Sequence, residues 1–291
     1  MFKGSIVALI TPFDDKGNVD LETYKRLVGW HIEQGTDGIL VAGCTGESFT
    51  LHEDERDALL SAALEVAKGK IPVIMGTGAS ETKLAVQRTE RAKKIGADAA
   101  LVITPFGNKP TQEALYNYYR EVADVGLPII MYNVPSRTGT NLLPQTVARL
   151  SEIDGIVAIK EASGSVDQMS AILKYAPSIT LLSGDDSLTL PALALGAKGV
   201  VSTIANIAPQ DFADMVRHFQ NGDIQHAREI HFRLYPLMKA LFLEGNPVPL
   251  KAAMEMLGIC SGNLRPPLTP ASQKTREALE EALKQAKLII E

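Results

Sequence analysis

The sequence predicts an α/β protein: a (β/α)8 TIM barrel followed by a helical C-terminal region. Eight short apolar segments rich in β-branched residues recur over the first 206 residues, and each is followed by a segment with apolar residues at helical spacing. The apolar segments are nearly continuous rather than alternating, which is typical of parallel strands buried on both faces. The repeat covers about 220 residues, the usual size of this barrel.

The predicted strands lie at 5–13, 38–43, 72–78, 100–106, 128–135, 156–162, 179–186 and 199–206. The segments between them have the pattern of amphipathic helices. In 21–35, for example, Tyr24, Leu27 and His31 fall on one face. Glycines close to the ends of these segments, such as Gly196, are typical helix C-caps.

A doubly wound open sheet uses the same alternation of strands and helices and is the alternative to the barrel. Its dinucleotide-binding fingerprint G-x-G-x-x-G is incomplete, since the segment 76–80 reads GTGAS, and no G-x-x-x-x-G-K-[ST] phosphate loop is present. The missing motifs favour the closed barrel.

No further strand is predicted after Asn206. The remaining sequence predicts helices separated by two proline-rich helix breakers. The helices are expected at 209–220, 223–243, 248–257 and 271–288, and the breakers are NPVPLK at 246–251 and RPPLTP at 265–270. We therefore divide the chain into a barrel, 1–222, and a C-terminal helical region, 223–291.

Composition excludes several classes of protein. The net charge of -5 offers no extended positive surface for nucleic acid. No apolar run reaches the roughly 18 residues of a membrane span, and Lys3 with the apolar stretch after it lacks the cleavage pattern of a secretory signal. The two cysteines, Cys44 and Cys260, form no C-x-x-C motif, so we expect a reducing, cytoplasmic location.

Catalytic groups of such barrels project from the carboxyl ends of the strands and the loops that follow. Lys160 stands out there because it follows the apolar run 156–159, where desolvation would lower its pKa and leave a nucleophilic amine. The alternative is a lysine that extends to water or pairs with Glu161. Position at a strand end favours the nucleophile.

Three further positions could assist such a lysine. Tyr132 ends the neighbouring strand and could exchange protons at the amine, although a buried tyrosine is often only part of a core. Thr45 and Gly46 occupy a glycine-rich turn whose N–H groups could bind a carboxylate. Arg137, in the loop PSRTG, could bind a second carboxylate or could be an ordinary surface arginine.

No metal site is expected. The acidic run HEDERD at 52–57 is predicted to begin a helix, where acidic side chains interact favourably with the positive end of the helix dipole. The segment DDKGN at 14–18 lacks the spacing of an EF-hand loop. His226 and His231 are five residues apart and do not share a helix face.

Six motifs together resemble the dihydrodipicolinate synthase / N-acetylneuraminate lyase family, in order and over nearly the whole chain. They are GCTGES (43–48), YNVPSRTG (132–139), IKEASG (159–164), SGDD (183–186), GVVSTIAN (199–206) and NPVPLK (246–251). The arginine in YNVPSRTG resembles the synthase branch rather than the sialic acid lyases.

The resemblance implies a class I Schiff-base lyase of lysine and diaminopimelate biosynthesis that needs no metal or other cofactor. Lys160 would form a covalent Schiff base with pyruvate, which would then condense with aspartate-4-semialdehyde. Tyr132 would be the general acid/base. The substrate site would comprise Thr45 and Gly46 for the pyruvate carboxylate, Arg137 for the carboxylate of the aldehyde, and Gly184, Asp185 and the Val201 carbonyl. A homotetramer or homodimer is implied, with the C-terminal helices contributing to assembly.

Two motifs depart from the family pattern. Cys44 replaces the first threonine of G-T-T-G-E, and TPFGNKP has Phe106 and Gly107 where two tyrosines are usual. Both the first threonine and the second tyrosine belong to a hydroxyl relay with Tyr132. A thiol relays protons poorly and glycine has none to give, which predicts a slower enzyme, a water-filled relay or a different substrate. Our hypothesis is that water fills the space beside Gly107.

Because of these departures, two other functions remain as alternatives. One is a paralogous class I aldolase or deaminase acting on another 2-oxo acid or aldehyde, and the other is a catalytically weak ligand-binding descendant.

The sequence also predicts how the protein responds to lysine. At positions matching the lysine effector pocket of the family, this chain has Glu53, Arg56, Ser80, Leu84 and Phe106. Because Arg56 is cationic and Leu84 lacks a carboxylate, we expect weak or no inhibition by lysine.

Overall fold

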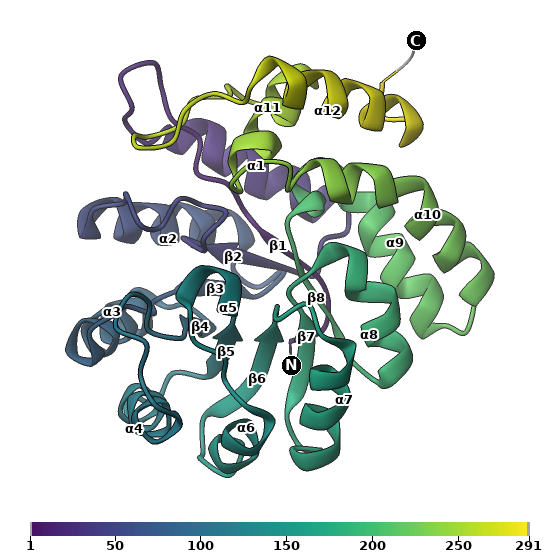
Figure 1. The fold of residues 1–291 in the computed structure, drawn as a ribbon. Coiled ribbons are helices and arrows are strands. Elements are labelled where there is room, and N and C mark those ends of the chain that lie inside the picture. The colour runs from purple at the N-terminus through teal and green to yellow at the C-terminus, as the bar shows by residue number, and fades with distance from the viewer. Residues whose placement is uncertain (1, 290–291) are drawn as a thin grey trace.

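The chain forms a closed parallel barrel ringed by helices (Figure 1), in a computed structural model that describes residues 2–289. Each strand pairs with its sequence neighbours, and β8 pairs with β1 to close the sheet. The strands are β1 Gly4–Ala8, β2 Gly38–Val41, β3 Val73–Gly76, β4 Ala99–Ile103, β5 Ile129–Asn133, β6 Ile156–Glu161, β7 Thr180–Ser183 and β8 Gly199–Ser202. The predicted barrel is confirmed.

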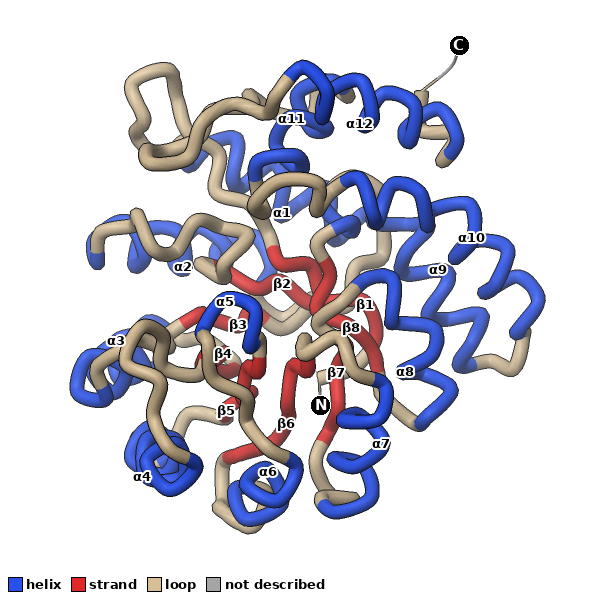
Figure 2. The backbone as a smooth tube through the Cα atoms, viewed as in Figure 1, coloured by secondary structure: helices blue, strands red, loops and turns tan. Residues whose placement is uncertain are grey.

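Helices surround the sheet on its outer face (Figure 2). Those of the barrel are α1 Leu21–Glu33, α2 Glu53–Ala67, α3 Thr82–Ile95, α4 Gln112–Ala123, α5 Pro135–Thr138, α6 Pro144–Leu150, α7 Val166–Tyr175, α8 Thr189–Leu195 and α9 Pro209–Gln220. Two 3-10 turns, η1 Asp186–Leu188 and η2 Ile204–Asn206, follow β7 and β8. The predicted glycine cap is present at Gly196, whose φ of 113° is left-handed.

Side chains alternate along the strands between two apolar layers. One layer fills the barrel interior and includes Ile6, Leu40, Leu101 and Leu182. The other lies between the strands and the helices. Burial on both faces explains the continuous apolar runs of the sequence.

The observed strands are shorter than the sequence predicts. The residues that were predicted as strand but lie outside the sheet are mainly at the carboxyl ends. Segments such as 9–13 and 203–206 are buried but leave the sheet as turns. Their burial made them resemble strand, and of these residues Thr203 lines the cavity described below.

Three helices follow the barrel: α10 Ile224–Ala240, α11 Val248–Met256 and α12 Gln273–Gln285. α10 packs on α9, and α12 packs on α10 and α11 (Figure 1). No helix within residues 2–289 is both long and apolar enough to cross a membrane.

Candidate active site

Lys160 and Tyr132 lie side by side at the carboxyl end of the barrel. They are direct register partners on β6 and β5, so their side chains project from the same face of the sheet. The Lys160 Nζ lies 4.3 Å from the centre of the Tyr132 ring. Gly184 leaves room for the lysine, because a Cβ there would lie 3.2 Å from Lys160 Cε and 2.6 Å from Ala162 Cβ.

Burial sets the protonation of this pair. Lys160 is 6% exposed, and loss of solvation lowers its pKa from 10.5 to about 8, although the nearby Asp185 and Asp186 favour the charged form. The pKa of the Tyr132 phenol is raised well above its usual value by the same burial. The site therefore holds an amine that is readily deprotonated beside a phenol that keeps its proton.

The turn after β2 holds two backbone N–H groups without a partner among the described residues, and its Thr45 lines the same cavity as Lys160 and Tyr132. None of the hydrogen bonds within residues 2–289 uses the backbone N–H of Thr45 or Gly46. Glu47 has a left-handed φ of 55°, which turns the chain and helps to form a concave group of N–H donors. A side chain at Gly46 would approach the Leu9 carbonyl to 2.9 Å, so the turn needs glycine at this position.

A cavity of about 300 Å³ connects these groups to Arg137 on α5. The predicted site residues that line it are Cys44, Thr45, Tyr132, Arg137, Lys160, Gly184 and Asp185. Arg137 is exposed, and its Nη2 donates to the backbone oxygen of Asn246 at 3.1 Å. The cavity thus brings together a cationic group, the Lys160 amine and the turn that carries the unpaired N–H groups.

Asn246 is a site residue that the sequence reasoning missed, because NPVPLK was interpreted as a helix breaker and a family motif only. It lines the cavity, and its side chain donates to Thr45 Oγ1 at 2.9 Å. Its Oδ1 and the Asp185 Oδ2 are buried acceptors without a hydrogen bond among the described residues. Both oxygens remain able to accept from a ligand.

Cys44 stands between this cavity and a second one of about 370 Å³, and Tyr132 also lines both. Burial raises the pKa of the Cys44 thiol, so it is protonated at neutral pH. Cys44 therefore occupies the expected relay position as a neutral thiol.

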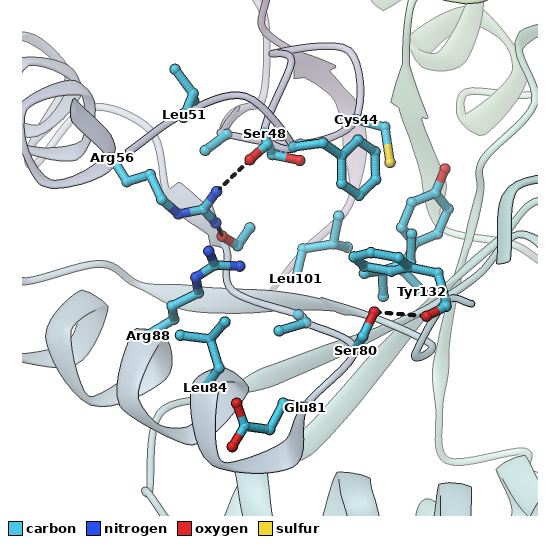
Figure 3. Close-up of a pocket in the computed structure, with 18 residues that line it drawn as sticks. Cys44, Ser48, Leu51, Arg56, Ser80, Glu81, Leu84, Arg88, Leu101 and Tyr132 are labelled. Atoms are coloured by element: carbon cyan, nitrogen blue, oxygen red, sulfur yellow. Dashed lines mark hydrogen bonds between the residues drawn. The ribbon is translucent and has the colours of Figure 1, made fainter. Parts of the chain in front are cut away.

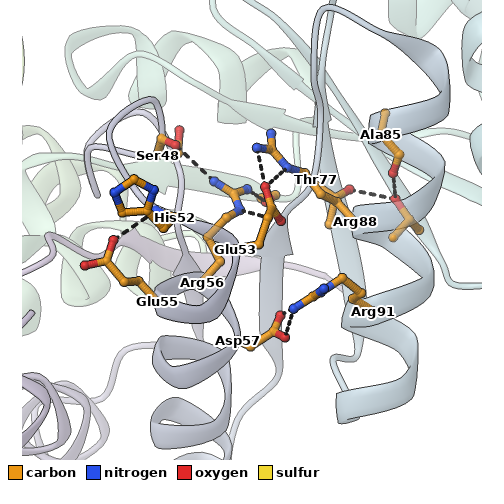
Figure 4. Close-up of polar contacts among 12 residues, drawn as sticks. Ser48, His52, Glu53, Glu55, Arg56, Asp57, Thr77, Ala85, Arg88 and Arg91 are labelled. Atoms are coloured by element: carbon orange, nitrogen blue, oxygen red, sulfur yellow. Dashed lines mark hydrogen bonds and ion pairs between the residues drawn. The ribbon is translucent and has the colours of Figure 1, made fainter.

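The second cavity is largely apolar and holds two arginines at one end (Figure 3). Arg56, on α2, donates to the backbone oxygens of Ser48 and Gly76. Arg88, on α3, binds Glu53 through Nε at 2.8 Å (Figure 4).

Three predicted positions do not line the catalytic cavity, and one of them, Gly46, directly follows Thr45, which does. Gly107 is exposed with a φ of 86°, and a Cβ there would meet no atom within 4 Å. Val201 belongs to the apolar interior of the barrel, and the wall of the cavity next to β8 is formed by Thr203. Phe106 lines the second cavity and packs edge-to-face on Phe49 at 5.1 Å.

His226 does have a histidine neighbour, but it is His218 rather than His231. Both imidazoles contact Asp223 Oδ2 through Nδ1, His218 at 3.0 Å and His226 at 2.7 Å. Asp223 is the N-cap of α10, and its other oxygen accepts from the His226 backbone. These hydrogen bonds account for the cluster as a helix cap.

Comparison with known proteins gives matches over the full length. The sequence model of the dihydrodipicolinate synthetase family matches residues 1–286. The 4-hydroxy-tetrahydrodipicolinate synthase of Thermodesulfovibrio yellowstonii is 49% identical over 291 residues, covering 99% of this chain and 100% of the relative. The crystal structure of dihydrodipicolinate synthase from Aquifex aeolicus has a TM-score of 0.95 at 48% identity and covers 99% of both chains.

A third match is the chloride-inhibited dihydrodipicolinate synthase from Acinetobacter baumannii, solved in complex with pyruvate. It has a TM-score of 0.97 at 42% identity and covers 99% of this chain and 100% of that one.

Proposed function

Because this chain belongs to the dihydrodipicolinate synthetase family, we propose that it condenses pyruvate with L-aspartate-4-semialdehyde to give 4-hydroxy-tetrahydrodipicolinate, in lysine and diaminopimelate biosynthesis. It is a lyase that acts through a Schiff base on Lys160. The activity needs no metal or organic cofactor and belongs to the cytoplasm. The observation that carries the proposal is the buried Lys160 amine beside the Tyr132 ring, in a cavity that also holds open N–H donors and a guanidinium.

The reaction begins when the neutral Lys160 amine attacks the ketone carbon of pyruvate. Tyr132 donates a proton to the departing oxygen, and water leaves as the Schiff base forms. Loss of a proton from the pyruvate methyl group gives an enamine, whose carbon attacks the aldehyde and forms the new C–C bond. The aldehyde oxygen takes a proton and becomes the hydroxyl group. The amino group of the second substrate then adds to the imine carbon, closes the ring and releases the Lys160 amine.

Two anion sites orient the substrates. The N–H groups of Thr45 and Gly46 bind the pyruvate carboxylate, and Arg137 binds the carboxylate of the aldehyde through paired hydrogen bonds. Gly184, Asp185 and the Val201 carbonyl complete the substrate site. Two candidate anion sites in one cavity with the Lys160 amine support a reaction between two carboxylate-bearing molecules.

A class I aldolase for a different aldehyde would also need Lys160 and Tyr132, and Arg137 distinguishes the two functions. An assay with pyruvate should show rapid turnover of aspartate semialdehyde and little of an aldehyde that lacks a carboxylate. Arg137→Ala should lower kcat/KM for aspartate semialdehyde by roughly 100-fold, because a charge-assisted contact is lost. The surface variant Arg149→Ala is the control. Equal use of both aldehydes by the unmodified protein would contradict the proposal.

A further inference from the structure

We infer that Asn246 and Lys251, from the segment after the barrel, are positioning residues for the turn that binds pyruvate. The inference rests on the proposed function, since it assigns a task to residues around that site. Asn246 reaches the turn at Thr45, and Lys251 reaches it at Glu47. The C-terminal helical region thereby becomes part of the active site, in addition to any role in assembly.

Lys251 forms an ion pair with Glu47 directly behind the turn, and both side chains are almost completely enclosed. The Nζ of Lys251, on α11, lies 2.5 Å from Glu47 Oε1, and the two side chains are 0% and 1% exposed. The same Nζ donates to the Asn263 carbonyl at 2.7 Å and lies 4.2 Å from the centre of the Phe13 ring. The other Glu47 oxygen accepts from the Arg265 backbone N–H at 3.1 Å. These contacts fix the glutamate from two separate C-terminal segments.

The position of this pair points to a geometric role. Removing two charges from water is costly, and two well-packed apolar side chains often stabilise a fold as well as a buried ion pair does. The ion pair can instead hold the turn that contains Glu47 in one defined conformation. Glu47 is the left-handed residue that follows Thr45 and Gly46, so a shift of its side chain would rotate the backbone that carries the open N–H donors.

Asn246 connects the turn to the second anion site. Its Nδ2 donates to Thr45 Oγ1 at 2.9 Å, which occupies a lone pair of the hydroxyl and leaves its proton free for a carboxylate. Its backbone oxygen accepts from Arg137 Nη2 at 3.1 Å. One buried residue therefore holds a group from each of the two carboxylate sites.

The test compares two ion pairs of the C-terminal region. Lys251→Met breaks the buried pair with Glu47. Arg276→Met breaks the partly exposed pair of α12 with Glu255 on α11, in which the atoms are 2.6 Å apart, and serves as the matched control. Borohydride trapping of the Lys160 adduct is measured against pyruvate concentration. We expect Lys251→Met to raise the half-saturating pyruvate concentration by up to about 100-fold at an unchanged maximal yield. Arg276→Met should bind pyruvate as the unmodified protein does.

Loss of folding is controlled with the double variant Glu47→Leu/Lys251→Met, which replaces the pair with apolar side chains of similar size. We expect it to keep the melting temperature of the unmodified protein while still requiring more pyruvate. Normal half-saturation in the double variant, or equal effects of Lys251→Met and Arg276→Met, would overturn the inference. If the unmodified protein formed no adduct at any pyruvate concentration, the proposed function itself would fail, and the inference with it.

Discussion

At Lys160, Tyr132 and Cys44, burial favours the uncharged form of each side chain. Desolvation lowers the pKa of the lysine and raises the pKa values of the phenol and the thiol. A Schiff-base enzyme needs this combination, because the amine must be neutral to attack and the neighbouring group must hold a proton to donate. A single physical effect would thus prepare both the proposed nucleophile and the proposed acid.

The lowered pKa of Lys160 predicts how adduct formation depends on pH. At pH 7, a lysine with a pKa of about 8 is neutral roughly 300 times more often than one at 10.5. At low pyruvate concentration, the rate of trapping should rise with pH as the amine loses its proton and level off above about pH 8. A rate that kept rising toward pH 10 would show an ordinary lysine and contradict this account.

Cys44 provides a second prediction at the scale of one residue. Cys44→Thr restores a hydroxyl group beside Tyr132, so kcat should rise by up to about tenfold, a part of what positioned acid/base groups contribute. Cys260→Ser changes the cysteine that lines neither cavity and should leave kcat unchanged. Unchanged turnover in Cys44→Thr would mean that the relay does not limit this enzyme. The left-handed Gly107 is a poorer place for such a test, since a tyrosine there would be strained.

At the scale of elements, the strands and their order could be predicted from the sequence because burial on both faces leaves a continuous apolar signal. The carboxyl ends of the strands could not be located in the same way. Ala42 and Gly43 are as buried as the strand before them, and only hydrogen bonding separates the two.

The part of the site built from single strands was predictable, and the part built from contacts between distant segments was not. Lys160 and Tyr132 follow from the register of neighbouring strands. Asn246 and Lys251 depend on contacts with residues about 200 positions away, such as the 201 positions between Asn246 and Thr45. No local pattern in the sequence signals such a contact.

Helices α2 and α3 supply a prediction about regulation. Arg56 is buried in the wall of the second cavity, and Leu84 offers no carboxylate to an ammonium group. Burial lowers the pKa of Arg56 only to about 10, so it stays cationic at neutral pH. Millimolar lysine should therefore leave the rate of the unmodified protein almost unchanged. Strong inhibition by lysine in a steady-state assay would refute this expectation, and Arg56→His/Leu84→Glu should increase sensitivity.

At the scale of the whole molecule, closure of the sheet brings the carboxyl ends of β2, β5, β6, β7 and β8 around one cavity. Groups from β5 and β6, the turn after β2, α5 and the segment before α11 meet there, although they are spread from residue 44 to residue 246. The arrangement explains why no short motif of the sequence contains the complete site.

The oligomeric state of the protein is a further prediction. We expect a homodimer or homotetramer, in which a second copy covers the 54% exposed Phe49 beside the second cavity. Light scattering coupled to gel filtration should give a mass of two or four times that of the 31.4 kDa chain. A mass of one chain at micromolar protein would contradict the expectation.

Every step proposed for this site depends on a Schiff base between Lys160 and pyruvate. Borohydride reduction in the presence of pyruvate, followed by peptide mass spectrometry, tests its formation most directly, with Lys160→Met and the α12 variant Arg276→Met as controls. We predict a reduced pyruvyl adduct on Lys160 in the unmodified protein, the same adduct in Arg276→Met, and none in Lys160→Met. Absence of the adduct from the unmodified protein, or its attachment to another lysine, would contradict the account.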